Sequence, residues 1–123
     1  NKRVAIGDSH TLLELKVHDV LAQVNDDITD IQRPLPGESF RDTALRTMGR
    51  DVFLTSVNAL AQTGEMVNID GTGNRVAASL FGSQEVFFVL GINKITPDLA
   101  SAIYRARNVA APLNSKNNKK TSN

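Results

Sequence analysis

Residues 67–80 join a strand-like run to a helix-like run through two glycines, Gly71 and Gly73. Glycine has no Cβ, so it adopts positive φ angles and lets another molecule approach the backbone closely. A helix that begins after such a turn presents unpaired N–H groups and the positive end of its dipole, both of which attract anions. The segment therefore predicts a strand, a turn and a helix. The turn either contacts an anionic ligand or only connects the two elements.

This turn does not match the common phosphate-binding motifs. Val76 stands where a dinucleotide-binding fingerprint has its third glycine, and no acidic residue follows about twenty positions later to bind a ribose. No Gly-Lys-Ser or Gly-Lys-Thr follows the glycines either, so the segment is not a P-loop.

Strand-like and helix-like runs alternate along the chain, which predicts a layered α/β fold with a mainly parallel sheet. The continuous apolar run 86–90 is typical of a strand in the sheet interior, covered on both faces. Ser9 suits the cap of the first helix, whose apolar residues follow helical spacing at Leu13, Val17, Val20, Leu21 and Val24. Pro97 suits the first position of the last helix. Residues 25–37 are expected to be mostly loop, with a brief extended piece between Ile28 and Ile31. The expected strands cover residues 3–6, 52–54, 66–69 and 86–90, and the expected helices cover residues 9–24, 38–48, 74–81 and 97–106.

The composition indicates one domain over residues 1–113, followed by a polar tail at 114–123, because 123 residues with 41% hydrophobic content form one core. No basic stripe with interleaved aromatic residues is present, which argues against nucleic-acid binding. No apolar run reaches the roughly 20 residues that span a bilayer, and no signal-peptide pattern opens the chain, so we expect a cytoplasmic protein without a membrane partner. The absence of cysteine excludes disulfides and thiolate metal ligands within these residues.

Ligands of open parallel sheets collect at the carboxyl ends of the strands, so the residues after each strand are candidates for binding. Arg75 can pair with a carboxylate or phosphate through two N–H groups, and Lys94 supplies a second positive charge. Asparagine side chains both donate and accept hydrogen bonds, which suits a small hydroxy or keto acid. The predicted ligand-binding residues are Ser9, Asn58, Asp70, Gly71, Thr72, Gly73, Asn74, Arg75, Asn93 and Lys94.

Each candidate also has a purely structural interpretation. Arg75 either binds a ligand or packs against an acid at the sheet edge, and Asp70 either transfers protons or forms a turn. His10 is either an acid–base group or part of a helix start. His18 lies about 12 Å from His10 along a helix at 1.5 Å per residue, so the two cannot share a metal ion, and we predict no metal site. The catalytic residues stay unknown, with Asp70 and His10 as weak candidates.

Four ordered segments, residues 51–60, 67–80, 91–95 and 107–114, together resemble the lactate-utilization (LUD) domain family, and the turn Gly7–Leu12 resembles that family's first strand-to-helix turn. The resemblance implies a three-layer fold with helices on both faces of the sheet, similar to the sugar-phosphate isomerase and CoA-transferase fold group. It also implies that N-terminal helical sequence of the family is missing here.

The resemblance further implies an accessory protein or subunit of a cytoplasmic system that oxidises L-lactate to pyruvate. Its partners would be a small anionic metabolite and other lactate-oxidation subunits. Many family members end in a cysteine-containing tail after Lys-Thr-Pro-Cys, whereas here Lys120-Thr121 is followed by Ser122 and Asn123, and no cofactor is evident. Two alternatives stay open: a stand-alone enzyme of that fold group acting on a small anionic metabolite, or a noncatalytic ligand-binding module.

Overall fold

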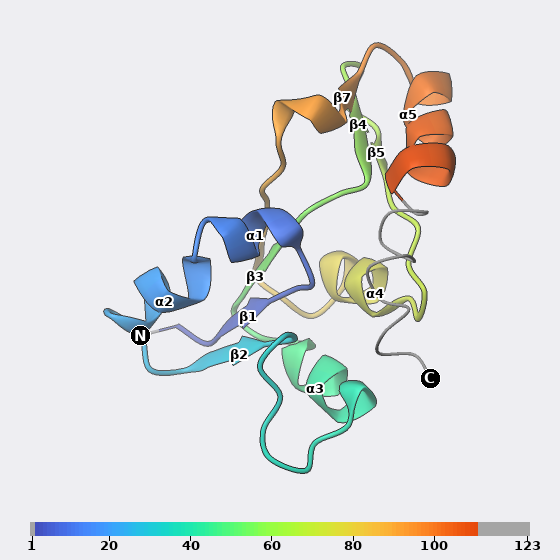
Figure 1. Ribbon diagram of the computed structural model, residues 1–123. Helices are drawn as coiled ribbons and strands as arrows, with labels where there is room; N and C mark the ends of the chain where they lie inside the picture. The colour runs from blue at the N-terminus through green and yellow to red at the C-terminus, as the bar shows by residue number, and fades with distance from the viewer. Residues whose placement is uncertain (1, 111–123) are drawn as a thin grey trace. The chain divides into compact units, whose positions relative to one another are not determined.

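The computed structural model describes residues 2–110 (Figure 1). Its contacts divide this part of the chain into two compact units. The first unit contains residues 2–56 and 74–89, and the second contains residues 57–73 and 90–110.

The first unit is built on a four-stranded parallel sheet with the strand order β2-β1-β3-β6. Each neighbouring pair in this order is parallel. The strands are β1 (Val4–Ile6), β2 (Ile28–Asp30), β3 (Val52–Thr55) and β6 (Glu85–Phe88). The α/β class and the mainly parallel sheet expected from the sequence are therefore confirmed.

Helices cover both faces of this sheet, because successive residues of a strand point to opposite faces. Val4 and Ile6 pack with Leu12 on one face, whereas Ala5 and Phe53 pack with Ala78 on the other. Figure 1 shows α1 and α2 on one side of β1 and β2, and α3 on the other. The helices of this unit are α1 (His10–Glu14), α2 (Val17–Ala22), α3 (Phe40–Thr47) and α4 (Asn74–Leu80).

The expected continuous helix over residues 9–24 is wrong, because the chain breaks between α1 and α2. Lys16 has a φ of 53° there, in the left-handed region that L-residues avoid. Ser9 caps α1 as expected, with its Oγ accepting the Leu12 N–H at 3.2 Å. Leu12 is buried, but the predicted apolar positions Leu13 and Val20 are exposed. After the break, Val17 and Leu21 of α2 are partly buried and pack against the same cluster as Leu12.

Replacing Lys16 with glycine is expected to raise the free energy of unfolding slightly. Relief of the left-handed conformation contributes about 1–2 kcal/mol, and the greater unfolded-state entropy of glycine offsets part of it, which leaves roughly 0.5 kcal/mol. Urea denaturation of the wild type and Lys16→Gly measures this difference. A clearly destabilised variant would show that the left-handed angle is not strained.

The second predicted helix is confirmed as α3. Ser39 caps it through a capping box, in which its side chain accepts the Asp42 N–H while the Asp42 side chain accepts the Ser39 N–H. The brief extended piece expected after Asn25 is also present. It is the strand β2, whose residue Ile28 pairs with Val4.

The expectation that residues 86–90 lie inside the sheet is wrong. The strand β6 covers Glu85–Phe88 and lies at one end of the strand order, next to β3. Its side chains alternate between exposed and half-buried, and Phe87 is 48% exposed. An apolar run alone therefore does not distinguish a central strand from an edge strand, because the number of neighbouring strands is set by tertiary structure.

The second unit contains a three-stranded sheet with the order β5-β4-β7, in which β4 is antiparallel to β5 and parallel to β7. Ala59 and Ala61 of the central strand pack against Ala102 and Ala106. Neither β4 nor β7 was expected from the sequence. The elements of the second unit are β4 (Ala59–Ala61), β5 (Met66–Val67), β7 (Ile95–Thr96) and the helix α5 (Leu99–Arg105).

The start of α5 differs from the expectation for Pro97. Asp98 is the N-cap, and its Oδ1 accepts the Ser101 N–H at 2.8 Å. Pro97 therefore precedes the cap and is not the first helical residue. The buried positions of α5 include Ala102, whereas Leu99 is 42% exposed. None of the helices within residues 2–110 has the length and apolar composition required to cross a bilayer.

Candidate functional site

Gly7 lies at the carboxyl end of β1. The chain adds β2 on one side of β1 and β3 on the other, so the direction in which successive strands are added reverses at β1. The Gly7 N–H donates to the Leu54 carbonyl at 2.8 Å. A Cβ at this position would lie 3.1 Å from Phe53 Cζ and 3.1 Å from Thr55 Oγ1, so the backbone needs glycine to pass this closely. Open α/β sheets bind their ligands at such reversal points, outside the carboxyl ends of the strands.

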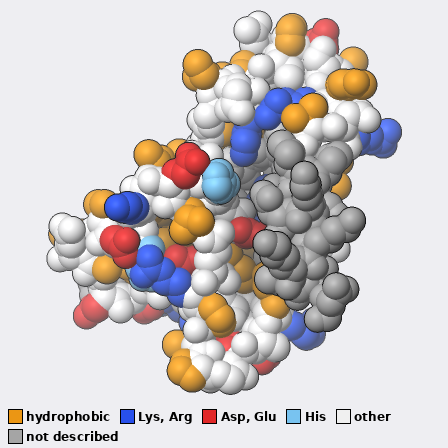
Figure 2. All heavy atoms as spheres, in the orientation of Figure 1, with side chains coloured by type: hydrophobic (Ala, Val, Ile, Leu, Met, Phe, Trp, Pro, Cys, Tyr) orange, Lys and Arg blue, Asp and Glu red, His pale blue; other side chains and the backbone are white. Residues whose placement is uncertain are grey.

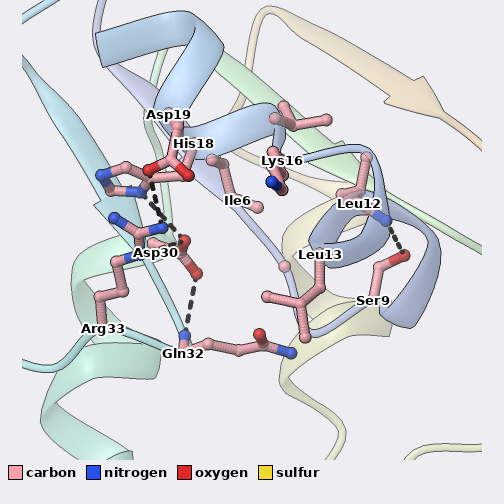
Figure 3. A pocket seen from close by; sticks show the side chains of 12 residues that line it. Ile6, Ser9, Leu12, Leu13, Lys16, His18, Asp19, Asp30, Gln32 and Arg33 are labelled. Atoms are coloured by element: carbon pink, nitrogen blue, oxygen red, sulfur yellow. Dashed lines mark hydrogen bonds and ion pairs between the residues drawn. The ribbon is translucent and has the colours of Figure 1, made fainter.

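A cavity of about 240 Å³ lies in the first unit, beside the carboxyl ends of β1 and β2 and next to α1 and α2 (Figure 3). Its apolar lining includes Ile6, Leu12 and Val17. Its charged and titratable lining consists of Lys16, His18, Asp19, Asp30 and Arg33.

Asp30 is the central acid of this cavity and is only 8% exposed. Its Oδ2 lies 3.0 Å from His18 Nδ1 and 3.8 Å from Arg33 Nε, and its Oδ1 accepts the Gln32 N–H at 2.9 Å. An ionised carboxylate only accepts hydrogen bonds, so we assign the proton of this contact to His18 Nδ1.

The two cations of the cavity have different surroundings. Arg33 Nη2 donates to Asp19 Oδ1 at 3.0 Å, so Arg33 contacts Asp19 as well as Asp30. Among residues 2–110, the Lys16 ammonium makes no ion pair. Lys16 is also the residue with the left-handed φ angle at the break between α1 and α2. Figure 3 shows Lys16 on the far side of Ile6 from the His18–Asp30–Arg33 group.

An ion pair between Glu38 and Arg46 anchors the loop that carries Arg33. Arg46 Nη2 donates to Glu38 Oε1 at 2.8 Å, and the same oxygen accepts the Leu35 N–H at 3.0 Å. Arg46 Nη1 also donates to Thr29 Oγ1 on β2 at 3.2 Å. The hydrogen bonds from Arg46, supported by those from Leu35 and Thr43, lower the pKa of Glu38 to about 2.

The ion pair between Glu38 and Arg46 predicts that the free energy of unfolding decreases in acid. Because the folded-state pKa is about 2 and the ordinary value is 4.5, the contribution of Glu38 is complete above pH 4.5 and is lost as the pH falls towards 2. We expect the stability advantage of the wild type over Glu38→Gln to shrink from neutral pH to about pH 2.5. Urea denaturation across this range tests it, and a pH-independent difference would contradict the assigned ion pair.

Ser9 and His10, the two predicted residues of the first strand-to-helix turn, have different surroundings. Ser9 is buried and lines the cavity as the cap of α1. His10 points to solvent, where its Nε2 lies 2.9 Å from Glu14 Oε1, one helical turn later, with the His10 side chain 76% exposed. Its proposed acid–base role stays a prediction.

Asn58 belongs to the second unit and is only 2% exposed. Its Oδ1 accepts the Ile69 N–H at 2.6 Å, and its own N–H donates to Asn68 Oδ1 at 3.2 Å. These bonds connect the start of β4 to the segment that leads into the glycine turn. Asn58 therefore has a structural role, and a ligand contact stays a prediction.

The glycine turn was expected at the carboxyl end of a strand of the parallel sheet, and this expectation is wrong. It follows β5, which pairs antiparallel with β4 in the second unit. Gly73 has a φ of 82°, whereas a Cβ added at Gly71 would meet no atom within 4 Å. Thr72 is exposed and Asp70 is half-buried. Contact of these four residues with a ligand stays a prediction.

The other predicted residues lie in two short helices. Asn74 and Arg75 begin α4 in the first unit, and Arg75 is only 9% exposed. Asn93 and Lys94 end the 3₁₀ helix Ile92–Lys94 in the second unit, with Asn93 exposed and Lys94 half-buried. Their roles in ligand binding stay predictions.

Sequence analysis missed the group formed by Lys16, His18, Asp30 and Arg33. One signal was available: Asp30 directly follows Ile28 and Thr29, so it is a polar residue at the carboxyl end of a strand. Asp30 could have been identified as a candidate only if the brief extended piece had been predicted to be a strand of the parallel sheet.

Residues 2–110 contain no group of three or more His, Asp and Glu side chains arranged to hold a metal ion. On the face seen in Figure 2, Lys and Arg side chains are interspersed with Asp and Glu side chains.

Comparison with known proteins gives one match. The family model of the LUD domain matches residues 1–123, which is the whole chain. No curated protein and no solved structure matches the sequence significantly.

Proposed function

This chain belongs to the LUD-domain family, and we propose on that basis that it is an accessory protein or subunit of a cytoplasmic system that oxidises L-lactate to pyruvate. The observation that carries the proposal is the family match over the full 123 residues. Its partners are a small anionic metabolite and other lactate-oxidation subunits.

The cavity of the first unit supports a role in handling a small acid. Lys16 and Arg33 supply positive charge, and Ile6 and Leu12 supply an apolar surface. Lactate and pyruvate each combine a carboxylate with a methyl group, so both kinds of surface have a counterpart in the ligand. Ser9, one of the ten residues predicted from the sequence, lines this cavity, and the other nine stay candidate contacts.

The oxidation of lactate removes two electrons and two protons, and cofactors usually carry such chemistry. These 123 residues contain no cysteine, so they do not fit a cysteine-ligated iron–sulfur cluster. We assign binding and positioning of the acid to this chain and electron transfer to a cofactor or partner. The alternative of a stand-alone enzyme is favoured by the His18–Asp30 pair, because a histidine oriented by a buried carboxylate suits proton transfer.

Deletion of the gene tests the proposed function. We expect slow or absent growth on L-lactate, normal growth on pyruvate, and recovery when the gene is returned. Normal growth of the deletion strain on L-lactate would overturn the proposal. A second assay supplies L-lactate and an artificial electron acceptor to the purified chain, free of flavin and metal. Reduction of the acceptor by the chain alone would favour the stand-alone enzyme over the accessory role.

A further inference from the structure

We propose that the strand β6 is an interface between two copies of this chain, which pair antiparallel along its outer edge, the side that points away from β3. Among the strands within residues 2–110, β6 pairs with β3 alone and lies at one end of the strand order. Pairing of two copies at this edge joins their parallel sheets into one continuous sheet, with a two-fold axis at Phe87.

The backbone of β6 has hydrogen-bonding groups along this outer edge. The N–H groups of Glu85 and Val89 donate to carbonyls on the β3 side, at 3.1 Å and 2.8 Å. Backbone groups of successive residues point alternately to the two sides of a strand, so those of Val86 and Phe88 point away from β3. In the part of the chain that the structure describes, neither of these two N–H groups donates to another residue. A second strand can therefore pair here without displacing an existing hydrogen bond.

The side chains of β6 do not protect this edge. Edge strands usually avoid pairing with other chains through charged side chains, proline or a bulge. Residues 86–90 are all apolar, and Phe87 is 48% exposed. The strand at the other end of the sheet, β2, follows Asp27 and ends in Asp30, so its edge carries acidic side chains. Of the two ends of this sheet, β6 is therefore the one suited to a further strand.

The residues of β6 match those of a second copy in antiparallel pairing. When Phe87 lies opposite Phe87 of the second copy, Val86 of each copy lies opposite Phe88 of the other. Both members of that pair direct their backbone groups to the outer edge, so they exchange two hydrogen bonds. The two Phe87 rings lie on one face of the joined sheet, and aromatic pairs across neighbouring strands are stabilising.

Charge selects the antiparallel direction. Within β6, Glu85 is the only charged residue, and its Oε1 lies 2.8 Å from Lys2 Nζ. Antiparallel pairing places the two Glu85 side chains at opposite ends of the interface. Parallel pairing places them side by side, where like charges are destabilising. The interface is short, so the dimer is weak and depends on protein concentration.

Sedimentation velocity of the purified 123-residue chain, over a range of protein concentrations, tests the proposal. We expect a reversible equilibrium between monomer and dimer for the wild type. Phe87→Lys places two positive charges opposite each other and should weaken dimerisation by about tenfold or more. The matched control is Phe81→Lys, because Phe81 belongs to the same unit, is 89% exposed and lies outside β6. It should keep the wild-type dissociation constant.

Amide hydrogen exchange of the wild type locates the interface without a substitution. We expect the N–H groups of Val86 and Phe88 to exchange more slowly as the protein concentration rises. The exposed N–H groups of β2, at the other end of the sheet, should exchange at the same rate at every concentration.

The inference is overturned by a wild type that stays monomeric, by unchanged dimerisation of Phe87→Lys, or by equal weakening in Phe87→Lys and Phe81→Lys. Slow exchange of Val86 and Phe88 at every concentration also overturns it, because another segment of the same chain would then occupy the edge. If Phe87→Lys does not fold, hydrogen exchange of the wild type decides, and exchange of Val86 and Phe88 that does not depend on concentration overturns the inference.

Discussion

Replacing Phe53 with alanine is expected to lower the free energy of unfolding by about 3–5 kcal/mol, the largest effect among the changes considered. Phe53 lies in β3 between β1 and β6 and is 1% exposed. Its ring packs with Ala5 and Ala78, small side chains that cannot fill the space left by a missing ring. Small domains are stable by about 5–15 kcal/mol, so this single change removes a large share of the total.

Urea denaturation followed by circular dichroism measures the effect, and Phe81→Ala is the matched control. Phe81 is 89% exposed after the end of α4, so its truncation should change the free energy of unfolding by no more than about 0.5 kcal/mol. Similar losses in the two variants would show that Phe53 is not a core residue.

Replacing Asn58 with alanine is expected to cost about 1–3 kcal/mol of stability, because the Ile69 N–H loses the acceptor of a part-buried hydrogen bond. Asn58 Oδ1 accepts the Ile69 N–H at 2.6 Å, and alanine offers no acceptor. Asn93→Ala is the control, since Asn93 is an exposed asparagine of the same unit and of the same predicted ligand set. Its effect on stability should stay within about 0.5 kcal/mol.

Thermal unfolding and L-lactate titration of these two variants separate structural roles from binding roles. A lower melting temperature with unchanged affinity assigns Asn58 to the structure alone. An unchanged melting temperature in Asn58→Ala would contradict the structural role described above. For Asn93, the binding measurement decides, because an exposed side chain affects the ligand without affecting the fold.

The features that were predicted correctly depend on neighbours in the sequence. Ser9 caps α1 because its side-chain oxygen reaches the N–H three residues later, an interaction that needs no other part of the protein. The strand at Val52 was recognisable from its apolar residues and the turn before it. Such local signals also established the α/β class, because strand and helix periodicities alternate along the chain.

The features that were missed depend on distant partners. The alanines of β4 have little preference for strands, and β7 has only two residues, so both exist because they pair with each other: Leu60 lies opposite Ile95, and Ala61 lies opposite Thr96. The edge position of β6 likewise depends on which strands lie beside it. The spacing of apolar residues within a strand does not show which strands lie beside it.

The sequence by itself determined the α/β class, the parallel sheet, the capped start of the first helix and the membership of a family, because these follow from local patterns and from ordered motifs. Only the tertiary structure decided the cavity. Pairing of β2 beside β1 places Asp30 near the end of β1, and the break at Lys16 lets α2 bring His18 to Asp30. Side chains that are separated along the chain form one site only after strand order and helix direction are set by long-range packing.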